Sequence, residues 1–473
     1  MGRGARIRGC RGSDSGRGSA AGHGRSSLLI PKPSRQARPE AGAVTATAAP
    51  DLPPLPRTAW LAIDLDRLSA NTAAIRSGLP HGVRLEPVVK ADAYGHGALG
   101  TASWLETCGV DGFSVATLDE AVELRRGGIR LPILVLYPVP PDLAPDAAGL
   151  DVALTAGDMD LLARTLAAIR RGRGGGSSQS HPLTIQVEVE TGLGRGGFDE
   201  GDLPNALAAI ADAPDVRLAG IWSHLSAAGD RSRTSAQHAR FERALATLGT
   251  SDPDVALRHI AASGGLLAAS VPPFDSVRLG LSTYGLIPDG LTADPSLIAA
   301  AQRLEPAMSL HARAVRVVDL PAGHGVSYGP SFETSRPSRI ATLPIGYGDG
   351  WPRELSNRAE ALVRGVRVPL VGTVAMDAVM AEVTDVPGPP VGVDDEFVLF
   401  GEQDGHRITA LDLAQRRTTI SYEVVTAMAR RVARVYYRSA VPVGLRTLTE
   451  ETYAWRLSNS GTETSATSRW TRS

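Results

Sequence analysis

Apolar and polar positions change period repeatedly along the first two thirds of the chain, and this pattern predicts alternating strands and helices. Residues 59–65 alternate with a period of two, as in a strand, and residues 66–79 have helical spacing that ends at a glycine. Residues 117–128 are predicted to form a helix that begins with a capping box, Thr117 and Glu120, and ends at two glycines. Strands and helices in this order predict βαβ units around a parallel sheet.

The length of this alternating region predicts the architecture. The span from Thr58 to about Ala300 approaches the roughly 250 residues of a (β/α)8 barrel. From residue 307 onward, strand-like runs separated by turn residues replace the helical patterns, which indicates a mostly β structure. We therefore predict an α/β fold, with a (β/α)8 TIM-type barrel at residues 58–300 and a β-rich C-terminal domain at residues 301–448.

The two ends of the chain have the composition of disordered segments. Residues 1–50 carry eight arginines and one lysine against two acidic residues, with many Gly, Ser and Ala residues. Such a segment cannot bury enough apolar surface to order itself, so we predict a disordered extension over residues 1–57 and a tail over residues 449–473. We favour a flexible segment or a misassigned start site over a transit peptide as the explanation of this extension. A transit peptide needs an amphipathic helix, which the glycines of the extension oppose.

Composition and charge narrow the class of protein. The 473 residues are 43% hydrophobic and 21% charged with a net charge of −1, which is typical of a globular protein and does not indicate a nucleic-acid partner. The two cysteines, Cys10 and Cys108, have no metal-binding spacing, and a reducing, cytoplasmic compartment is favoured over a disulfide. No run of about 18 apolar residues occurs, so no membrane span is expected.

One lysine stands where a reactive amine would be useful. Lys90 ends the apolar run RLEPVVK, and Tyr94 follows four residues later. Functional groups gather at the C-terminal ends of barrel strands, and a partly desolvated lysine there is suited to forming a Schiff base. An edge lysine that extends into water explains the spacing equally well, so the pattern alone leaves both interpretations open.

Nine motifs between about Thr58 and Arg446 resemble, in content and order, those of the alanine racemase family. They are VVKADAYGHG, SVATLDEAVELRRGGIRLPILVL, TGLGRGGF, GIWSHLSAAGD, VRLGLSTYGL, VSYGPSF, LPIGYGDGW, VGTVAMD and TISYEVVT. The resemblance implies pyridoxal 5′-phosphate as cofactor, bound by a barrel that precedes a β domain, which agrees with the predicted fold. It also implies an isomerase that interconverts L- and D-alanine and supplies D-alanine for peptidoglycan.

The resemblance assigns the two proton-transfer residues. It implies that Lys90 binds the cofactor aldehyde covalently and acts as a base once the substrate amine has released it. Racemisation removes the α-proton from one face and returns it to the other, and one base cannot easily reach both faces. The resemblance therefore implies a second base, Tyr328 in VSYG. The pKa of a free lysine is about 10, so that of Lys90 must be lowered for proton transfer near neutrality.

Further residues are implied to hold the cofactor and the substrate. Arg278 corresponds to the arginine that faces the pyridine nitrogen, and because arginine stays protonated, that nitrogen stays neutral, which favours return of the α-proton over transamination. His224 corresponds to a histidine near the ring that links the tyrosine base to Arg278. The implied phosphate contacts are Tyr94, Ser263, Gly280, Leu281 and Tyr422. The implied substrate contacts are Arg195 and the backbone N–H of Met376, with Tyr347 near the entrance.

Three positions depart from the family pattern. Many members carry a carbamylated lysine at the position of Glu188, and its added carboxylate holds the substrate-binding arginine. The polar side chains of residues 184–190 alternate toward one side, and we hypothesise that Glu188 supplies this carboxylate directly to Arg195; a solvated glutamate is the alternative. Ala262 and Ala375 replace an asparagine and a cysteine that are common in the family, and they leave alanine or serine open as substrate.

Two other functions share parts of the pattern. A related barrel decarboxylase of basic amino acids needs no base on the opposite face, so Tyr328 and Arg278 argue against it. A non-catalytic cofactor-binding relative lacks the β domain that this chain is predicted to have. The family builds each active site from two subunits, so the resemblance also implies a homodimer with shared active sites.

Overall fold

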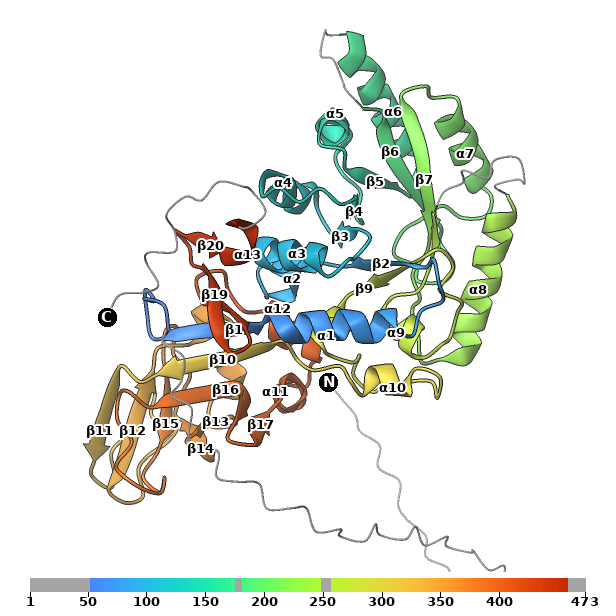
Figure 1. The fold of residues 1–473 in the computed structure, drawn as a ribbon. Helices are drawn as coiled ribbons and strands as arrows, with labels where there is room; N and C mark the ends of the chain where they lie inside the picture. The colour runs from blue at the N-terminus through green and yellow to red at the C-terminus, as the bar shows by residue number, and fades with distance from the viewer. Residues whose placement is uncertain (1–51, 175–180, 248–256, 458–473) are drawn as a thin grey trace, which may run out of the picture. The chain divides into compact units, whose positions relative to one another are not determined.

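The computed structural model describes residues 52–174, 181–247 and 257–457, which cover most of both predicted domains (Figure 1). Residues 1–51 of the predicted extension and residues 458–473 of the predicted tail lie outside the described residues, as does Cys10. None of the helices in the described ranges has the length and hydropathy needed to cross a lipid bilayer. Cys108 is a free thiol.

Eight parallel strands form the predicted barrel. They are β2 (Arg84–Pro87), β3 (Phe113–Val115), β4 (Ile133–Val135), β5 (Ala153–Ala156), β6 (Leu183–Glu188), β7 (Val216–Trp222), β8 (Leu257–His259) and β9 (Ser276–Leu279). β3 to β8 pair in chain order and β2 pairs with β9, while parallel bridges at Val88–Ser114 and Ala262–Arg278 join the two sheets into a ring. The expectation of a (β/α)8 TIM-type barrel is confirmed.

Helices alternate with these strands and surround them (Figure 1). They are α1 (Leu65–Arg76), α2 (Lys90–Tyr94), α3 (Ala98–Thr107), α4 (Leu118–Arg126), α5 (Ala144–Gly149), α6 (Met159–Gly174), α7 (Leu203–Ala211), α8 (Arg231–Ala246), α9 (Ser263–Leu267) and α10 (Ile298–Ala301). The predicted capping box of α4 is present, because the Glu120 carboxylate accepts the Thr117 N–H at 3.2 Å. At α1 the side chain of the N-cap residue itself, Asp64, accepts the Arg67 N–H at 2.9 Å.

The C-terminal domain is built on a twelve-stranded, mostly antiparallel sheet, so the predicted β-rich second domain is also confirmed. Its strand order is β11-β12-β15-β14-β13-β16-β10-β1-β18-β19-β20, and β17 pairs with β16. The strands are β1 (Ala59–Asp64), β10 (Met308–Arg313), β11 (Arg316–Leu320), β12 (Ser338–Leu343), β13 (Glu360–Val363), β14 (Val366–Val371), β15 (Val379–Glu382), β16 (Glu396–Gln403), β17 (His406–Ile408), β18 (Ala433–Arg438), β19 (Val441–Arg446) and β20 (Glu451–Tyr453). The helices here are α11 (Ala410–Arg417), α12 (Ser421–Thr426) and α13 (Ala454–Leu457).

The first strand differs from the prediction that the barrel begins at residue 58. β1 pairs antiparallel with β10 and parallel with β18, so it belongs to the sheet of the C-terminal domain. Its Trp60 stacks on His311 of β10 with ring centroids 5.3 Å apart and packs with Val435 and Leu445. A period of two predicts a strand but not its partner, which tertiary packing selects.

The boundaries of the predicted extension and tail were also wrong by several residues. Residues 451–457, assigned to the tail, form β20 and α13, in which Tyr453 is buried and Trp455 packs on its ring at 5.1 Å. Leu52 and Leu55, assigned to the extension, pack against the cluster around Trp60. The sequence that flanks these residues is polar, but their own side chains are apolar, and burying them stabilises their place in the fold.

The largest cluster of buried apolar residues runs from the barrel into the C-terminal domain. It includes Phe113 and Leu154 of the barrel strands and continues through Leu310 of β10 to Phe397 of β16. Close-packed interiors transmit small displacements. A change at the junction of the two domains is therefore expected to affect side chains in both.

Candidate active site

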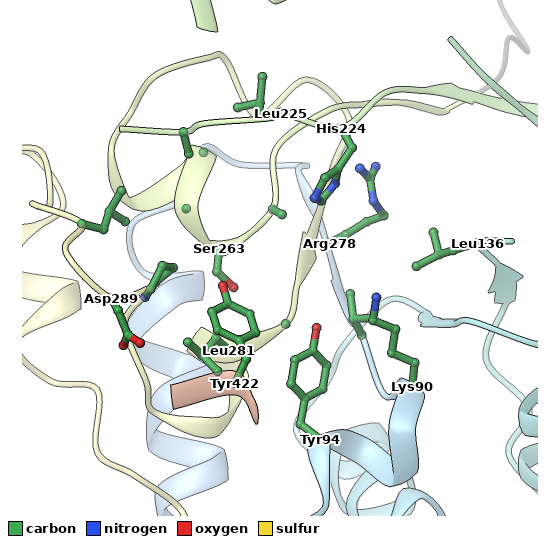
Figure 2. Close-up of a pocket in the computed structure, with 18 of the residues that line it drawn as sticks. Lys90, Tyr94, Leu136, His224, Leu225, Ser263, Arg278, Leu281, Asp289 and Tyr422 are labelled. Carbon is green, nitrogen blue, oxygen red and sulfur yellow. The ribbon is translucent and has the colours of Figure 1, made fainter. Parts of the chain in front are cut away.

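A cavity of about 580 Å³ opens at the C-terminal ends of the barrel strands, where barrel enzymes place their functional groups. Figure 2 shows the side chains of Lys90, Tyr94 and Tyr422 entering it from one side and those of His224 and Arg278 from another. Nine of the residues proposed from the sequence line it, namely Lys90, Tyr94, Arg195, His224, Ser263, Arg278, Gly280, Leu281 and Tyr422. Both domains contribute to this lining, because α12 supplies Tyr422.

Lys90 is the only lysine among the described residues, and the chain contains one other, Lys32. Burial lowers the pKa of the Lys90 ammonium, and the positive charges of Arg195 and Arg278 lower it further against the opposing effect of Glu120. The neutral, nucleophilic amine is therefore populated at a lower pH than that of an exposed lysine. An arginine at this position would not lose its proton.

The chain makes a left-handed turn directly after Lys90. Residues 91–94 all have positive φ, between 51° and 56°, so α2 is one left-handed helical turn. This conformation costs roughly 1–2 kcal/mol per L-residue. The turn brings Tyr94 to the cavity together with Lys90, and the Ala91 N–H donates to Glu120 Oε1 at 2.7 Å. Glu120 thus has a second function beyond the capping box that the sequence predicted.

Arg278 lines the cavity from β9 and is held by hydrogen bonds. Its Nη1 donates to His259 Nδ1, and its Nη2 donates to the Ser223 carbonyl at 2.7 Å. Because His259 Nδ1 accepts, the ring hydrogen lies on Nε2, which donates to Gln186 Oε1 at 2.7 Å. Burial lowers the pKa of Arg278 to about 10, so its guanidinium remains protonated at neutral pH.

His224 follows β7 and lies beside Arg278 (Figure 2). Burial lowers the pKa of its imidazole to about 3, with a further contribution from the charge of Arg278, so His224 is neutral at pH 7. The resemblance implied that His224 links a tyrosine to Arg278. In the structure, the imidazole that hydrogen-bonds to Arg278 is that of His259.

Another part of the cavity is rich in hydroxyl groups. The buried Ser263, at the start of α9, accepts the Ser282 N–H at 3.2 Å. A Cβ on Gly280 would lie 2.6 Å from Tyr94 Oη, so only glycine permits this close approach of the hydroxyl. Burial raises the pKa of the Tyr94 and Tyr422 hydroxyls. Both hydroxyls therefore keep their protons and are donors suited to an anion.

The carboxylate predicted to hold Arg195 is in place. Arg195 Nη2 lies 3.2 Å from Glu188 Oε1, and its guanidinium lies 5.4 Å from the centre of the Tyr137 ring. Glu188 is 6% exposed, and burial raises its pKa despite the lowering effect of Arg195. The Glu190 carboxylate accepts the backbone N–H groups of residues 192–194 and so folds the loop that carries Arg195.

Four residues proposed from the sequence do not line this cavity, namely Glu188, which contacts Arg195, and three residues of the C-terminal domain. Tyr328, Tyr347 and Met376 belong to the C-terminal domain, and their exposed fractions are 73%, 43% and 52%. A single chain therefore does not bring Tyr328 to Lys90. The order of motifs in a sequence does not reveal whether a residue acts in its own subunit or in another.

Two residues that hold the lining side chains in place were not predicted from the sequence. His259 orients Arg278 from the neighbouring strand, and Asp289 accepts both the N–H and the hydroxyl of Ser421, at 2.7 and 2.6 Å, next to Tyr422. Alternation along β8 predicts which face of the strand carries His259, but it does not predict that Arg278 of the neighbouring strand lies beside it. The sequence around Asp289 does not indicate its contact with Ser421, because the two residues are far apart in the chain.

The buried histidines predict a loss of stability in acid. The pKa of His96 is lowered to about 4 and that of His224 to about 3, in both cases mainly by burial. At pH values between these pKa values and the unfolded value of about 6.5, the unfolded chain binds more protons than the folded chain. The free energy of unfolding therefore falls as the pH falls, and each histidine contributes up to about 1.4 kcal/mol for each pH unit.

The variant His96→Asn tests this expectation by denaturant unfolding at pH 7 and pH 5. We expect the stability difference between the two pH values to shrink by about 1–2 kcal/mol relative to the unmodified protein. The loss of ring packing on Tyr284, whose ring centroid lies 4.3 Å from that of His96, lowers stability equally at both pH values. An unchanged difference would contradict the assignment of His96 as a buried neutral group.

Comparisons with known proteins agree with this geometry. Residues 63–288 match the family model described as alanine racemase, N-terminal domain, and residues 307–436 match the model described as alanine racemase, C-terminal domain. The chain is 40% identical over 383 residues to alanine racemase 2 of Caldanaerobacter subterraneus subsp. tengcongensis, which covers 80% of this chain and 95% of that protein. It is 40% identical over 384 residues to the alanine racemase of Symbiobacterium thermophilum, covering 80% and 97%.

Solved structures show the same similarity. The crystal structure of alanine racemase from Bacillus anthracis with bound L-Ala-P superposes with a TM-score of 0.75 at 33% identity, covering 84% of this chain and 99% of that chain. The histidine racemase from Leuconostoc mesenteroides subsp. sake superposes with a TM-score of 0.71 at 28% identity, covering 82% and 100%. The similarity therefore extends over the barrel and the C-terminal domain together.

Proposed function

The chain belongs to the alanine racemase family, and on that premise we propose that it interconverts L- and D-alanine with pyridoxal 5′-phosphate attached to Lys90. The observation that carries the proposal is the cavity in which a lysine of lowered pKa faces a protonated arginine and a group of hydroxyl donors. The product D-alanine would then serve peptidoglycan synthesis.

The residues of the cavity fit this cofactor. The amine of Lys90 is the group that reacts with an aldehyde. The hydroxyls of Ser263, Tyr94 and Tyr422 would hold the phosphate, and the absence of a side chain at Gly280 leaves room beside Tyr94 Oη. Arg278, which keeps its proton, would face the ring nitrogen without protonating it.

The chain's own groups then account for proton movement. When bound, pyridoxal phosphate supplies an electron sink for the electrons left at the α-carbon. Lys90 Nζ takes or gives the α-proton on one face, because burial and the nearby arginines lower its pKa and so favour the neutral amine. Arg195 binds the substrate carboxylate as a charged donor, and Glu188 holds Arg195 in position.

We propose that the second base is Tyr328 of another copy of this chain. Tyr328, Tyr347 and Met376 are exposed on the C-terminal domain and are absent from the Lys90 cavity of their own chain. A symmetric dimer would place this surface over the partner's cavity and the partner's surface over this one. The active enzyme is accordingly a homodimer in which each site uses residues of both subunits.

Replacing Glu188 with glutamine tests how Arg195 is held. The amide keeps the shape of the side chain but removes its charge, so we expect KM for alanine to rise about fivefold, or roughly 1 kcal/mol, with a smaller change in kcat. The control is Glu123→Gln, which removes the charge of a glutamate paired with Arg430 at 2.8 Å outside the cavity. Equal KM values in the two variants would contradict the role of Glu188.

The proposed activity is tested by incubating the purified protein with pyridoxal phosphate and L-alanine and separating the enantiomers. We expect D-alanine to accumulate until both enantiomers are equal. L-Serine and L-histidine are compared under the same conditions, the latter because a structural neighbour is a histidine racemase. Release of carbon dioxide from a basic amino acid without racemisation of alanine would overturn the proposal in favour of a decarboxylase.

A further inference from the structure

A buried ion cluster lies behind Lys90, on the side of the C-terminal domain. Asp92, in the left-handed turn, lies 2.6 Å from Arg446 Nη1 and 3.5 Å from Arg434 Nη2 through its Oδ2. The side chains of Arg446 and Arg434 are 3% and 0% exposed, and that of Asp92 is 15% exposed. None of these three residues lines the cavity. The cluster therefore contacts the segment that follows Lys90, but it does not contact a molecule bound in the cavity.

Strand β18 also holds Gly95 and His96, the residues that follow the left-handed turn. Arg434 donates two hydrogen bonds to the Gly95 carbonyl, at 3.1 and 3.0 Å, and Tyr436 Oη donates to the His96 carbonyl at 3.0 Å. A Cβ on Gly97, which has a φ of +92°, would lie 2.1 Å from Tyr436 Oη. Arg446, the last residue of β19, contacts α2 through Asp92 at 2.6 Å.

These contacts act on a segment that is unfavourable by itself. Ala91, Asp92 and Ala93 are L-residues in the left-handed region, which persists only where surrounding structure determines it. On the barrel side the Ala91 N–H is tied to Glu120, and on the other side the Asp92 carboxylate is tied to Arg446. Without Arg446, the nearest remaining cation to Asp92 Oδ2 is Arg434 at 3.5 Å. The turn would then relax, and Lys90 at its start would shift.

We propose that Arg446, acting through Asp92, is a positioning residue for Lys90. The C-terminal domain thereby sets the left-handed turn that directs the Lys90 amine into the cavity, in addition to the role proposed for Tyr328. This inference rests on the proposed function, because it concerns attachment of pyridoxal phosphate to Lys90.

The experiment measures covalent attachment rather than turnover. The full-length protein without cofactor is mixed with pyridoxal phosphate, reduced with borohydride at successive times, and analysed by intact mass and peptide mapping. Lys32 and Lys90 are the only lysines of the chain, so the peptide map assigns the product. We expect Arg446→Met to slow attachment at Lys90 by about 10- to 100-fold, as a displaced reactive group does.

The matched control is Arg364→Met. Arg364 forms a bidentate ion pair with Asp395, at 2.6 and 2.7 Å, elsewhere in the C-terminal domain. We expect this variant to attach the cofactor at the unmodified rate, even where its melting temperature falls as far as that of Arg446→Met. Equal attachment rates in the two variants would overturn the inference, because the ion pair of Arg446 would then be merely structural.

Two further variants test the route through Asp92 and the turn. Asp92→Asn keeps the oxygen that accepts the Ala98 N–H at 2.9 Å but loses the charge, so adding it to Arg446→Met should slow attachment no further. Ala91→Gly relieves the left-handed conformation and should speed attachment in the Arg446→Met protein. Additive slowing, or no recovery with glycine, would contradict the proposed route.

The outcomes separate this inference from the function on which it rests. If the unmodified protein forms no reduced adduct at Lys90, the proposed function fails and the inference fails with it. If the unmodified protein forms the adduct and Arg446→Met forms it equally fast, the inference alone is overturned.

Discussion

Replacing Lys90 with alanine should abolish racemisation while leaving the fold intact. The substitution removes both the amine proposed to hold the cofactor and the base proposed to exchange the α-proton, and we expect kcat to fall by at least about 10⁴-fold. Lys90 is only partly buried and forms no part of the apolar core, so the melting temperature should change little. Initial rates of D-alanine formation and thermal unfolding measure the two quantities.

Two other variants make this result specific to the amine. Lys90→Arg keeps the positive charge, but a guanidinium neither attaches the cofactor aldehyde in this way nor loses its proton near neutrality, so it should be as inactive as Lys90→Ala. Lys32→Arg removes the only other lysine of the chain and should retain full activity. Activity of Lys90→Ala within about tenfold of the unmodified protein would contradict both proposed roles of Lys90.

Replacing Tyr328 with phenylalanine should lower kcat by about 10²- to 10⁴-fold, the usual contribution of a general acid or base. The hydroxyl is lost while the ring remains, and 73% of the residue is exposed in the single chain. We therefore expect little change in KM for alanine, in cofactor attachment to Lys90 or in the melting temperature. Steady-state kinetics combined with the borohydride assay distinguishes this pattern from a general loss of structure.

Mixing two inactive variants tests whether Tyr328 acts in the other subunit. In a dimer of Lys90→Ala with Tyr328→Phe, one site carries both defects and the other carries neither. Random exchange of subunits should restore about one quarter of the unmodified activity. No recovery, in a mixture shown to contain mixed dimers, would contradict a site shared between subunits.

The fold was largely predictable from the sequence, and the errors in the prediction have a common cause. Alternation of strand-like and helical periods indicated the barrel, because each pattern depends on residues close in sequence. β1 was assigned to the wrong domain because its partners, β10 and β18, are distant in the chain. Tyr453 and Trp455 were assigned to a tail because the partners that make them part of the core, such as Tyr436, are also remote.

The sequence predicted most of the residues that line the candidate site, but not the contacts that hold those residues in place. Resemblance of short motifs identified Lys90, Arg278 and their neighbours, and the hypothesis on Glu188 correctly anticipated its contact with Arg195. The left-handed turn at residues 91–94 could not be predicted, since its residue types disfavour positive φ. Its hold on Asp92 by Arg446 depends on contacts between segments far apart in the chain.

The central claim is that two bases on opposite faces exchange the α-proton of alanine, and solvent deuterium tests it most directly. The protein is incubated with pyridoxal phosphate and L-alanine in deuterium oxide, and both enantiomers are analysed by mass during the first per cent or so of conversion. With two bases, the account predicts that newly formed D-alanine carries deuterium at the α-carbon, because the second base delivers a proton exchanged with solvent. D-Alanine that retains the original α-proton would show that a single base serves both faces, and the absence of D-alanine would contradict racemisation itself.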